Sequence, residues 1–569
     1  MEQTTTPKSG HPRGLYFLFF TEMWERFSYY GMRAIFILFM TKVLLMKDNE
    51  ASEIYGSYTG LVYLTPLLGG YLCDKFLGNR RSIIIGGLLM ALGQFLMFIS
   101  ANVGAGAGVS IMWAALTAII IGNGFFKPNI STMVGQLYPK GDRRIDSAFT
   151  IFYMGINLGA FFSPLICGSM DFKWGFLAAC IGMLASLVFF IIYQKRFLIS
   201  EEGKEIGLPV NKLDIKNILV IIGSIGIIFF MLNFKQLFKT QVDIIGYFIY
   251  GAMILMPIII LSDKSLTKVE RNRIIVIFIL AFFVIFFWGA FEQAGASLTL
   301  FADRQVDRAV HIFIPGWLIL AISMVLIYFL SKGLKWFFEW KKNMDYFVAA
   351  IMAVILIILF ALGYIPNIDK EDFPASWFQS VNPLAVILLA PVFSIIWGFL
   401  YTKKLEPSSP KKMALGLALV ALGYVVIAFA VKGLGVDGKT GMTALFALYI
   451  IHSMGELCLS PIGLSMVSKL APLRLSSLMM GTWFLANAAA NKFAGTLSAL
   501  IPPTPEPANP APLEYPSFVG FQITNLYEFF MVFILMTAAA AGILFILSSW
   551  LQKMMSEDHH EEHPTEVLH

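Results

Sequence analysis

Long runs of apolar residues recur along the whole chain and are separated by short polar segments. About 20 apolar residues are enough for an α-helix to cross a bilayer. The pattern predicts six spans in the first part of the chain, at about 15–45, 53–74, 82–100, 109–134, 147–170 and 174–194. It predicts six more in the second part, at about 273–303, 383–402, 411–433, 442–471, 475–500 and 527–555. Two further pairs, at about 215–233 with 243–263 and at about 309–333 with 345–363, bring the total to about sixteen.

The composition agrees with a protein that crosses a lipid bilayer many times. Of the 569 residues, 57% are hydrophobic and 14% are charged, whereas charged residues make up about 25% of soluble domains. The predicted fold class is therefore an all-α polytopic membrane protein. The four cysteines lie in or beside apolar runs without metal-ligand spacing, which favours packing roles over disulfides or zinc. We expect the net charge of +6 to mark cytoplasmic loops, with no nucleic acid as partner.

Basic residues are concentrated in alternate loops, which orients the predicted spans. Lys and Arg are frequent in the loops at 75–81, 139–144, 268–273 and 403–412. Such loops face the cytoplasm, whereas intervening loops such as 101–110 carry no Lys or Arg. We therefore expect both termini in the cytoplasm. The polar N-terminal tail has no apolar core with a cleavage site, so the first span is expected to act as its own signal.

The pair of spans at 309–363 is joined by a basic loop, KGLKWFFEWKKN at 332–343. This loop predicts a hairpin that enters from the outside and returns there, so the direction of later spans is unchanged. Alternatively, one or both segments lie along the membrane interface, which the mixture of aromatic and basic residues would also suit. Because the segments carry almost no charge, we expect them to pack on the outside of the bundle.

The first span contains the stretch TEMWERFSYYG, which places three charged residues in one helical turn. An ionised group at the bilayer centre costs roughly 2.5–3.5 kcal/mol, so these side chains must face protein or water. Spacings of four residues link Glu22 to Arg26 and Arg26 to Tyr30. The same spacing leads from Glu25 through a tyrosine to Arg33. A structural ion-pair network between helices would explain one such pair, but six polar groups on one wall favour a hydrated cavity.

Other spans carry polar residues of the same kind. The informative members are Lys127, directly before Pro128 in the fourth span, Glu292 in the seventh core span and Glu456 in the tenth. The residue before a proline is disfavoured in helical conformation, so we expect a kink beside Lys127. Further polar or aromatic neighbours in these spans are Tyr153, Asn157, Trp288 and Ser460.

The charges of these spans do not balance. Four carboxylates face three cations, and an unpaired carboxylate in a cavity of low dielectric tends to hold a proton. This is the chemistry that proton coupling requires. Lys492 would cancel the excess if its side chain faced the cavity, and the sequence leaves its orientation open.

These motifs carry a family resemblance. The loop GGYLCDKFLGNRRS resembles the cytoplasmic signature of the major facilitator superfamily. The whole chain is similar to the proton-coupled oligopeptide transporter (POT/PTR) family of that superfamily, in its bacterial type. The matching motifs are ExxERFxYYG at 22–31, GNGFFKPNIS at 122–131, FYMGINLGAF at 152–161, FWGAFEQAG at 287–295, PASWFQSVNP at 374–383 and GELCLSP at 455–461. The resemblance implies the major facilitator fold, two six-helix bundles plus two extra helix pairs, in a bacterial inner membrane.

The resemblance also implies a function. Such a protein is a secondary active transporter that imports di- and tripeptides by alternating access, with protons as the coupling ion and no other cofactor. The implied proton-coupling residues are Glu22, Glu25, Arg26, Lys127 and Glu292. The implied substrate-binding residues are Tyr30, Arg33, Tyr63, Lys127, Tyr153, Asn157, Trp288, Asn382, Glu456, Ser460 and Trp483.

Within these sets the resemblance implies distinct roles. Arg33 and Lys127 would hold the carboxylate of the peptide, and Glu456 would hold its amino terminus. Protonation of Glu292 would break an ion pair with Arg33, so proton and peptide would favour the same state.

The predicted domains follow the spans. They are an N-terminal tail (1–14), a six-helix bundle (15–200), a linker with the extra pair (201–270), the first helix of the second bundle (271–308), an inserted hairpin (309–366), the rest of that bundle (367–555) and a C-terminal tail (556–569). The insert departs from the fourteen helices typical of bacterial relatives. Its role, in oligomerisation, in contact with a partner or in bracing the outer gate, stays open, as do the oligomeric state and the peptide side-chain preference.

Two rival functions can be weighed from the residues. A relative that carries another small solute, such as nitrate, a glycoside or a peptide-like drug, is disfavoured because an anion without an amine needs no partner like Glu456. An enzyme would need a nucleophile with a base or a metal cluster, and the histidines of the spans are isolated. We therefore expect no catalytic site and no metal site, and we interpret the His- and Glu-rich tail as a solvated segment.

Overall fold

The structure is a computed structural model, and it describes residues 10–139, 142–209, 215–339, 343–363, 368–435, 438–503 and 515–556. Within these ranges it contains sixteen helices of 18 or more residues and the short helix α10. Among the described residues, twelve helical segments are long and apolar enough to cross a membrane, so the chain is a multi-pass membrane protein. The predicted all-α class and the predicted number of about sixteen long helices are confirmed.

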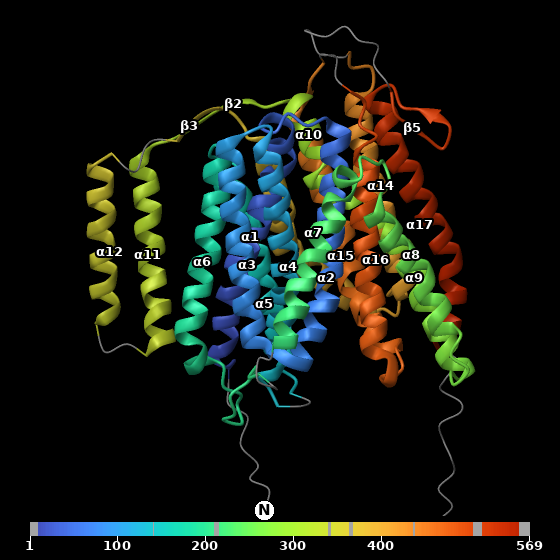
Figure 1. Ribbon diagram of the computed structural model, residues 1–569, viewed down its shortest axis with the longest axis horizontal. Coiled ribbons are helices and arrows are strands. Elements are labelled where there is room, and N and C mark those ends of the chain that lie inside the picture. The colour runs from blue at the N-terminus through green and yellow to red at the C-terminus, as the bar shows by residue number, and fades with distance from the viewer. Residues whose placement is uncertain are drawn as a thin grey trace, which may run out of the picture. The chain divides into compact units, whose positions relative to one another are not determined.

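Most of the helices belong to one compact unit, residues 1–306 and 375–569. Its first group of helices comprises α1 (Arg13–Lys42), α2 (Asp48–Leu72), α3 (Asn79–Val103), α4 (Ala107–Gln136), α5 (Ile145–Cys167) and α6 (Phe172–Phe197). Its second group comprises α9 (Lys268–Phe291), α13 (Val381–Thr402), α14 (Ser409–Val431), α15 (Met442–Leu470), α16 (Ser476–Ser498) and α17 (Leu526–Ser556). The pair α7 (Ile215–Leu237) and α8 (Ile244–Leu261) lies between them in sequence. Figure 1 shows the helices of this unit standing side by side.

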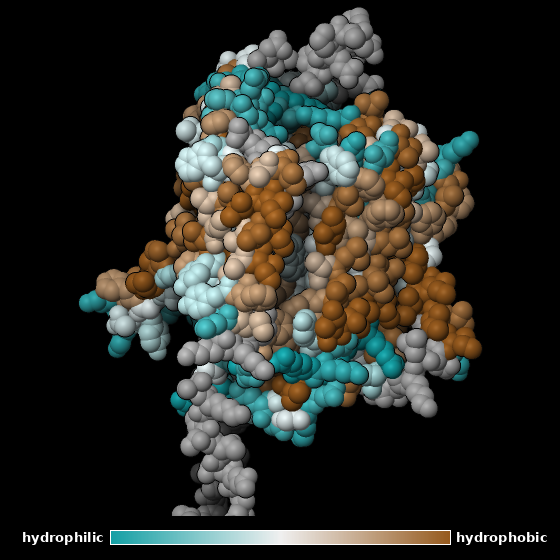
Figure 2. All heavy atoms as spheres, turned by 90° about the vertical axis from the view of Figure 1, so that its left-hand side faces the viewer, coloured by the Kyte–Doolittle hydropathy of each residue, from teal (hydrophilic) through white to brown (hydrophobic). Residues whose placement is uncertain are grey.

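The outward faces of these helices are apolar. On α6, for example, Ile181, Val188 and Ile192 are more than half exposed and repeat at helical spacing. On the side of the molecule that Figure 2 views, hydrophobic side chains gather between hydrophilic residues at the two ends. Such a surface is stable against lipid and would be unfavourable in water.

Short elements connect the helices. They are the π-helix η1 (Cys73–Leu77), the 3₁₀-helices η3 (Ala375–Ser380) and η4 (Leu473–Leu475), and the strands β1 (Val306–Asp307), β4 (Thr440–Gly441), β5 (Ser517–Phe518) and β6 (Phe521–Gln522). Next to η1, the buried guanidinium of Arg80 donates to the carbonyls of Leu198 and Ile206 at 2.8 Å each and pairs with Glu205. Arg80 therefore holds the segment after α6 against the start of α3.

The seventh core span is not the single helix that the sequence predicts for 273–303. Helix α9 ends at Phe291, the 3₁₀-helix η2 (Glu292–Gly295) follows, and α10 (Ser297–Arg304) resumes after a break at Ala296. Carbonyls around the break still find donors, since Tyr424 donates to Ala290 at 2.7 Å and Thr299 to Ala294 at 2.7 Å. Irregular backbone at membrane depth is tolerated where such partners exist. Glu292 thereby comes to lie at the end of a helix inside the unit.

The remaining residues, Asp307–Pro374, form a second compact unit. It contains the helices α11 (Gly316–Phe338) and α12 (Met344–Ala361) and the antiparallel strands β2 (Ala309–Ile314) and β3 (Ile368–Asp372). The prediction that a helix begins at 309 is wrong, because residues 309–314 pair with β3 instead. Near the other end of the helices, the buried Asp345 carboxylate pairs with Lys332 at 2.7 Å and Lys335 at 3.0 Å.

The two helix groups of the larger unit meet through backbone contact between α2 and α16. A Cβ atom added to Gly56 would lie 2.6 Å from the Cα of Gly495, closer than real Cβ atoms approach. One turn away, the hydroxyls of Ser52 and Ser498 are 2.8 Å apart. We call this contact the α2–α16 seam. Small residues at such positions let helix backbones come together.

Candidate functional site

A central cavity lies between the two helix groups. Helices α1, α2 and α5 of the first group line it together with α9, η2, η3, α13 and α15 of the second. Nine of the predicted site residues are brought together here: Tyr30, Arg33, Tyr63, Tyr153, Asn157, Trp288, Glu292, Asn382 and Glu456. The cavity is thus lined by aromatic rings with a small number of charged and amide groups, as ligand sites commonly are.

Arg33 and Glu292 form a buried ion pair across the two helix groups. Glu292 follows the last residue of α9, where the helix dipole disfavours a negative charge, so the guanidinium compensates for an unfavourable position. Arg33 also donates from Nε to the hydroxyl of Tyr55 at 2.6 Å. Sequence analysis did not single out Tyr55, because a tyrosine within an apolar helix is usually a packing residue.

Gly295 makes room for this arrangement. A Cβ atom added to it would lie 1.9 Å from the hydroxyl oxygen of Tyr55 and 3.0 Å from Nε of Arg33. Any larger residue at this position would therefore collide with the groups that hold the guanidinium. The break between α9 and α10 is the place where the second helix group touches Arg33.

Glu456 lies in a separate part of the polar lining. Its carboxylate accepts a hydrogen bond from the side-chain amide of Asn382 at 2.9 Å, and Asn382 also contacts the hydroxyl of Ser453 at 2.9 Å. Within the described ranges, no cation lies within ion-pair distance of Glu456. Glu456 is therefore a buried-site carboxylate without a cationic partner among the described residues.

A second polar cluster lies on α1 beside α4. Arg26 pairs with Glu25 and, at 3.0 Å, with Glu22, and the amide of Asn123 donates to Glu25 at 3.2 Å. All four side chains are buried, yet one oxygen of Glu22 and one terminal nitrogen of Arg26 have no partner in the part of the chain that the structure describes. The cluster is therefore charged, enclosed and incompletely satisfied. The predicted spacing of four holds for Glu22 and Arg26.

The tyrosines of α1 contact the arginines at a spacing of three, where the sequence suggests four. The guanidinium carbon of Arg26 is 5.4 Å from the ring centre of Tyr29, and that of Arg33 is 5.7 Å from that of Tyr30. Both spacings bring side chains together on a helix.

Lys127 connects the cluster on α1 with the cavity through an aromatic ring. Its ammonium is 4.3 Å from the ring centre of Tyr63, and Tyr63 itself lines the cavity. Lys127 forms no ion pair with another described residue. Helix α4 continues through Pro128 without a break in its residue range.

Three predicted or uncertain residues lie elsewhere. Ser460 and Trp483 do not line the cavity, and the ring of Trp483 packs against Gly463 of α15. Lys492 does not face the cavity either, because it pairs with Asp243 at 2.7 Å. Lys492 therefore leaves the charge of Glu456 uncancelled.

Two ion pairs that sequence analysis did not predict join α10 to the first helix group. Arg304 of α10 binds Asp48 of α2 with two contacts, one of 2.7 Å, and Lys42 of α1 binds Asp303 at 2.7 Å. These residues lie at the ends of spans, where charges are common, so only the fold shows that they face each other. The cavity lining also includes Gln379 and Tyr449, which the sequence did not single out.

Comparison with known proteins decides the family. The profile described as the POT family matches residues 80–339 and 346–509. The chain belongs to the POT family. The predicted family is thereby confirmed.

Relatives of the POT family resemble this chain over most of its length. The peptide transporter YePEPT of Yersinia enterocolitica subsp. palearctica serotype O:3 (strain YE-P4) is 33% identical over 514 residues, which cover 86% of this chain and 88% of the relative. A di-/tripeptide transporter of Lactococcus lactis subsp. cremoris is 32% identical over 512 residues, covering 84% and 88%.

Solved structures of POT family members share the fold. A crystal structure of a peptide transporter POT in complex with sulfate has a TM-score of 0.73, 30% identity and coverage of 97% of both chains. A structure of a mutant form in complex with alafosfalin has a TM-score of 0.72 and 29% identity over the same shares. Among the described residues of the present chain, no group of three or more His, Cys, Asp or Glu side chains could hold a metal ion.

Proposed function

We propose that this protein is a proton-coupled symporter that imports di- and tripeptides by alternating access, and that it is not an enzyme. The observation that carries the proposal is the charge arrangement of the central cavity. One guanidinium, Arg33, is held by a carboxylate that a proton can neutralise, and a second carboxylate, Glu456, has no cationic partner among the described residues. The relatives named as peptide transporters support this reading.

Peptides of variable sequence share only their backbone and their charged ends. In the proposed complex Arg33 and Lys127 bind the carboxylate, and Glu456 binds the ammonium group. Asn157, Asn382 and Ser460 provide hydrogen bonds to the backbone or termini. The side chains are accommodated by Tyr30, Tyr63, Tyr153, Trp288 and Trp483. Trp483 and Ser460 would join the site only in a state in which the cavity is wider than here.

Proton coupling follows from competition for Arg33. While Glu292 is ionised, it occupies the guanidinium, and the helix groups stay joined. Protonation removes the charge of Glu292, so Arg33 becomes available to the peptide carboxylate. Proton and peptide then favour the same conformational state, which is the thermodynamic condition for symport. The cluster of Glu22, Glu25 and Arg26 serves as the second proton-binding unit.

The orientation and location complete the proposal. We place the chain in the bacterial inner membrane with both termini in the cytoplasm, because the basic loops lie on that side. The end closed by the Asp48–Arg304 and Lys42–Asp303 pairs is then the outer end. The domain boundaries given from the sequence are proposed as the functional division of the chain into two bundles, a linker pair and an inserted hairpin.

Purified protein in liposomes that contain a pH-sensitive dye tests this function. External dialanine should acidify the lumen, whereas N-acetyl-dialanine, which lacks the ammonium group, should do so only weakly. The Glu456→Gln variant, which differs by one ionisable group, is the matched control and should reduce acidification by dialanine. Peptide entry without acidification would overturn proton coupling, and acidification by nitrate but not by peptide would establish the alternative, a POT relative that carries another small solute.

A further inference from the structure

Lys492 is a buried cation that does not line the central cavity. It lies on α16 at the α2–α16 seam and is 2% exposed. Its ammonium donates to the hydroxyl of Ser57 on α2 at 2.8 Å and pairs with Asp243 at 2.7 Å. Ser57 itself donates to the carbonyl of Glu53, so its oxygen is free to accept from Lys492. Three helices, α2, α8 and α16, thus meet at one charge.

Asp243 is fixed in place by its own helix. It is the N-cap of α8, and its other oxygen accepts the backbone N–H of Gly246 at 3.0 Å. Partial burial would raise the pKa of Asp243, but the charge and hydrogen bond of Lys492 hold that pKa below its ordinary value. The carboxylate therefore stays ionised at neutral pH.

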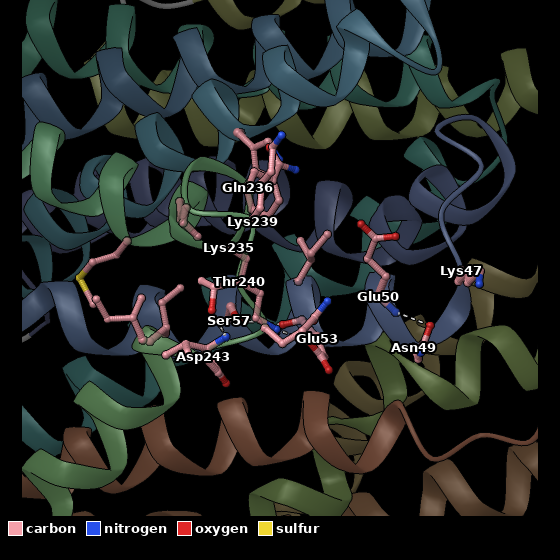
Figure 3. Close-up of a pocket in the computed structure, with 18 residues that line it drawn as sticks. Lys47, Asn49, Glu50, Glu53, Ser57, Lys235, Gln236, Lys239, Thr240 and Asp243 are labelled. Atoms are coloured by element: carbon pink, nitrogen blue, oxygen red, sulfur yellow. Dashed lines mark hydrogen bonds and ion pairs between the residues drawn. The ribbon is translucent and has the colours of Figure 1, made fainter. Parts of the chain in front are cut away.

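Helix α8 itself packs on the seam. Gly246 lies against the side chain of Lys492, since an added Cβ would be 3.4 Å from Cε of that lysine. One turn further, the buried Ile249 approaches Gly60 of α2, with its terminal carbon 3.2 Å from an added Cβ. Asp243 and Ser57 line a cavity of about 610 Å³. Figure 3 shows these two residues next to each other, with Glu50, Asn49 and Lys47 at the other side of the cavity. The extra helix pair is thus attached where the two helix groups touch.

We propose that Asp243 of the extra helix pair acts as a latch: by neutralising Lys492 inside the α2–α16 seam, it stabilises the state in which this end of the central cavity is closed. The inference rests on the proposed alternating access. In the closed state Lys492 is out of water and needs a compensating charge. When α2 and α16 separate, Ser57 moves away and water can solvate the ammonium, so Asp243 contributes less. Removal of its charge should therefore destabilise the closed state selectively.

Distances between spin labels measure this equilibrium. Cysteines for labelling replace the exposed residues Asp171, before α6, and Leu434, after α14, which lie in different helix groups at the same end of the larger unit. The four natural cysteines are buried. In Asp243→Asn, the population with a long distance between labels should rise about 10-fold or more, because the buried ammonium of Lys492 has lost its countercharge. Asp243→Glu should stay close to the wild type.

Two further variants separate a latch from a structural role. Glu53→Gln breaks the ion pair between Glu53, whose side chain is 48% exposed, and Lys235, whose side chain is 37% exposed. Because exposed pairs contribute little, this variant should leave the distances between the spin labels unchanged. In a Lys492→Met background there is no buried charge to neutralise, so Asp243→Asn should have no effect. Unchanged distances in Asp243→Asn, or an equal effect of that substitution with and without Lys492, would overturn the latch. The experiment needs no peptide, so its failure is distinct from failure of the proposed substrate.

Discussion

Replacing Gly295 with alanine should force the two helix groups apart at the α2–α16 seam. The added Cβ would lie 1.9 Å from the Tyr55 hydroxyl, so one of the two must retreat by at least about 1 Å to reach the shortest real contacts. Gly295 belongs to the second helix group, whereas Tyr55 and Arg33 both belong to the first. The collision therefore acts across the boundary between the groups, as a wedge.

The size of the effect follows from what the collision breaks. The Arg33–Tyr55 hydrogen bond is 2.6 Å long. If the hydroxyl retreats from Arg33 by about 1 Å, the two atoms are too far apart for a hydrogen bond. A hydrogen bond to a charged group contributes about 1.5–3 kcal/mol, and overpacking of a well-packed site costs about 1–3 kcal/mol. The overpacking cost falls on the closed state alone, because only there does Gly295 meet Tyr55, and it raises the equilibrium constant for opening by roughly 5- to 150-fold.

Disulfide trapping across the seam provides the assay. The hydroxyls of Ser52 and Ser498 are 2.8 Å apart, so cysteines at both positions should crosslink only while the end is closed. Gly295→Ala should slow crosslinking under mild oxidation. Tyr55→Phe removes the hydroxyl without touching the second helix group, so alone it should change the rate by no more than a few-fold.

The double variant decides the reasoning. In the Tyr55→Phe background the nearest obstacle is the ring carbon at 2.8 Å in place of the oxygen at 1.9 Å, so a large part of the crosslinking rate should return. An effect of Gly295→Ala that is equal in both backgrounds would show that the hydroxyl is not the obstacle. Rapid crosslinking in Gly295→Ala alone would refute the close packing at the helix break.

Three other outcomes are expected. Glu22→Gln or Glu25→Gln should abolish proton-driven accumulation of peptide but leave peptide counterflow, because exchange needs no net proton movement. Accumulation that survives in both variants would contradict the role of the cluster on α1 in proton coupling. Glu456→Gln should narrow the difference in affinity between free and N-acetylated dipeptides, as measured by calorimetry. Equal affinity of the wild type for both peptides would refute the pairing of Glu456 with the peptide's ammonium group. Deletion of 309–363 with a short polar closure should leave dipeptide uptake detectable per folded protein, whereas a folded variant that binds but cannot transport would assign the hairpin to gating.

Much of the fold could be predicted because lipid imposes strong rules on sequence. Apolar length determines the spans, and an expensive charge inside a span indicates an interior position, as Glu22 and Arg26 show. The helix break at Glu292 was missed, because Gly and Ser in an apolar run are equally compatible with close packing. Only the donors from other helices, such as Tyr424, reveal that the backbone is released there.

The partners of charged residues were the least predictable part of the site. Neighbours on one helix follow from spacing, whereas Lys492 and Asp243 are separated by about 250 residues and meet only through the packing of α8 on α16. Similarly, Asp48 and Arg304 lie at the ends of spans, where a charge is expected in any case. Sequence distance carries no information about such pairs without the fold.

The α2–α16 seam also bears on how fast the protein can work. Where side chains interdigitate, separation requires many rotamers to change together, and each closing step must order them again. At Gly56 and Gly495 the backbones touch directly, and glycine has no rotamers to order. A contact of this kind can part and reform with little loss of side-chain entropy, so the barrier between conformations is set mainly by the few polar bonds around it. The seam thus makes the turnover rate adjustable through single hydrogen bonds and ion pairs, without repacking of the helices.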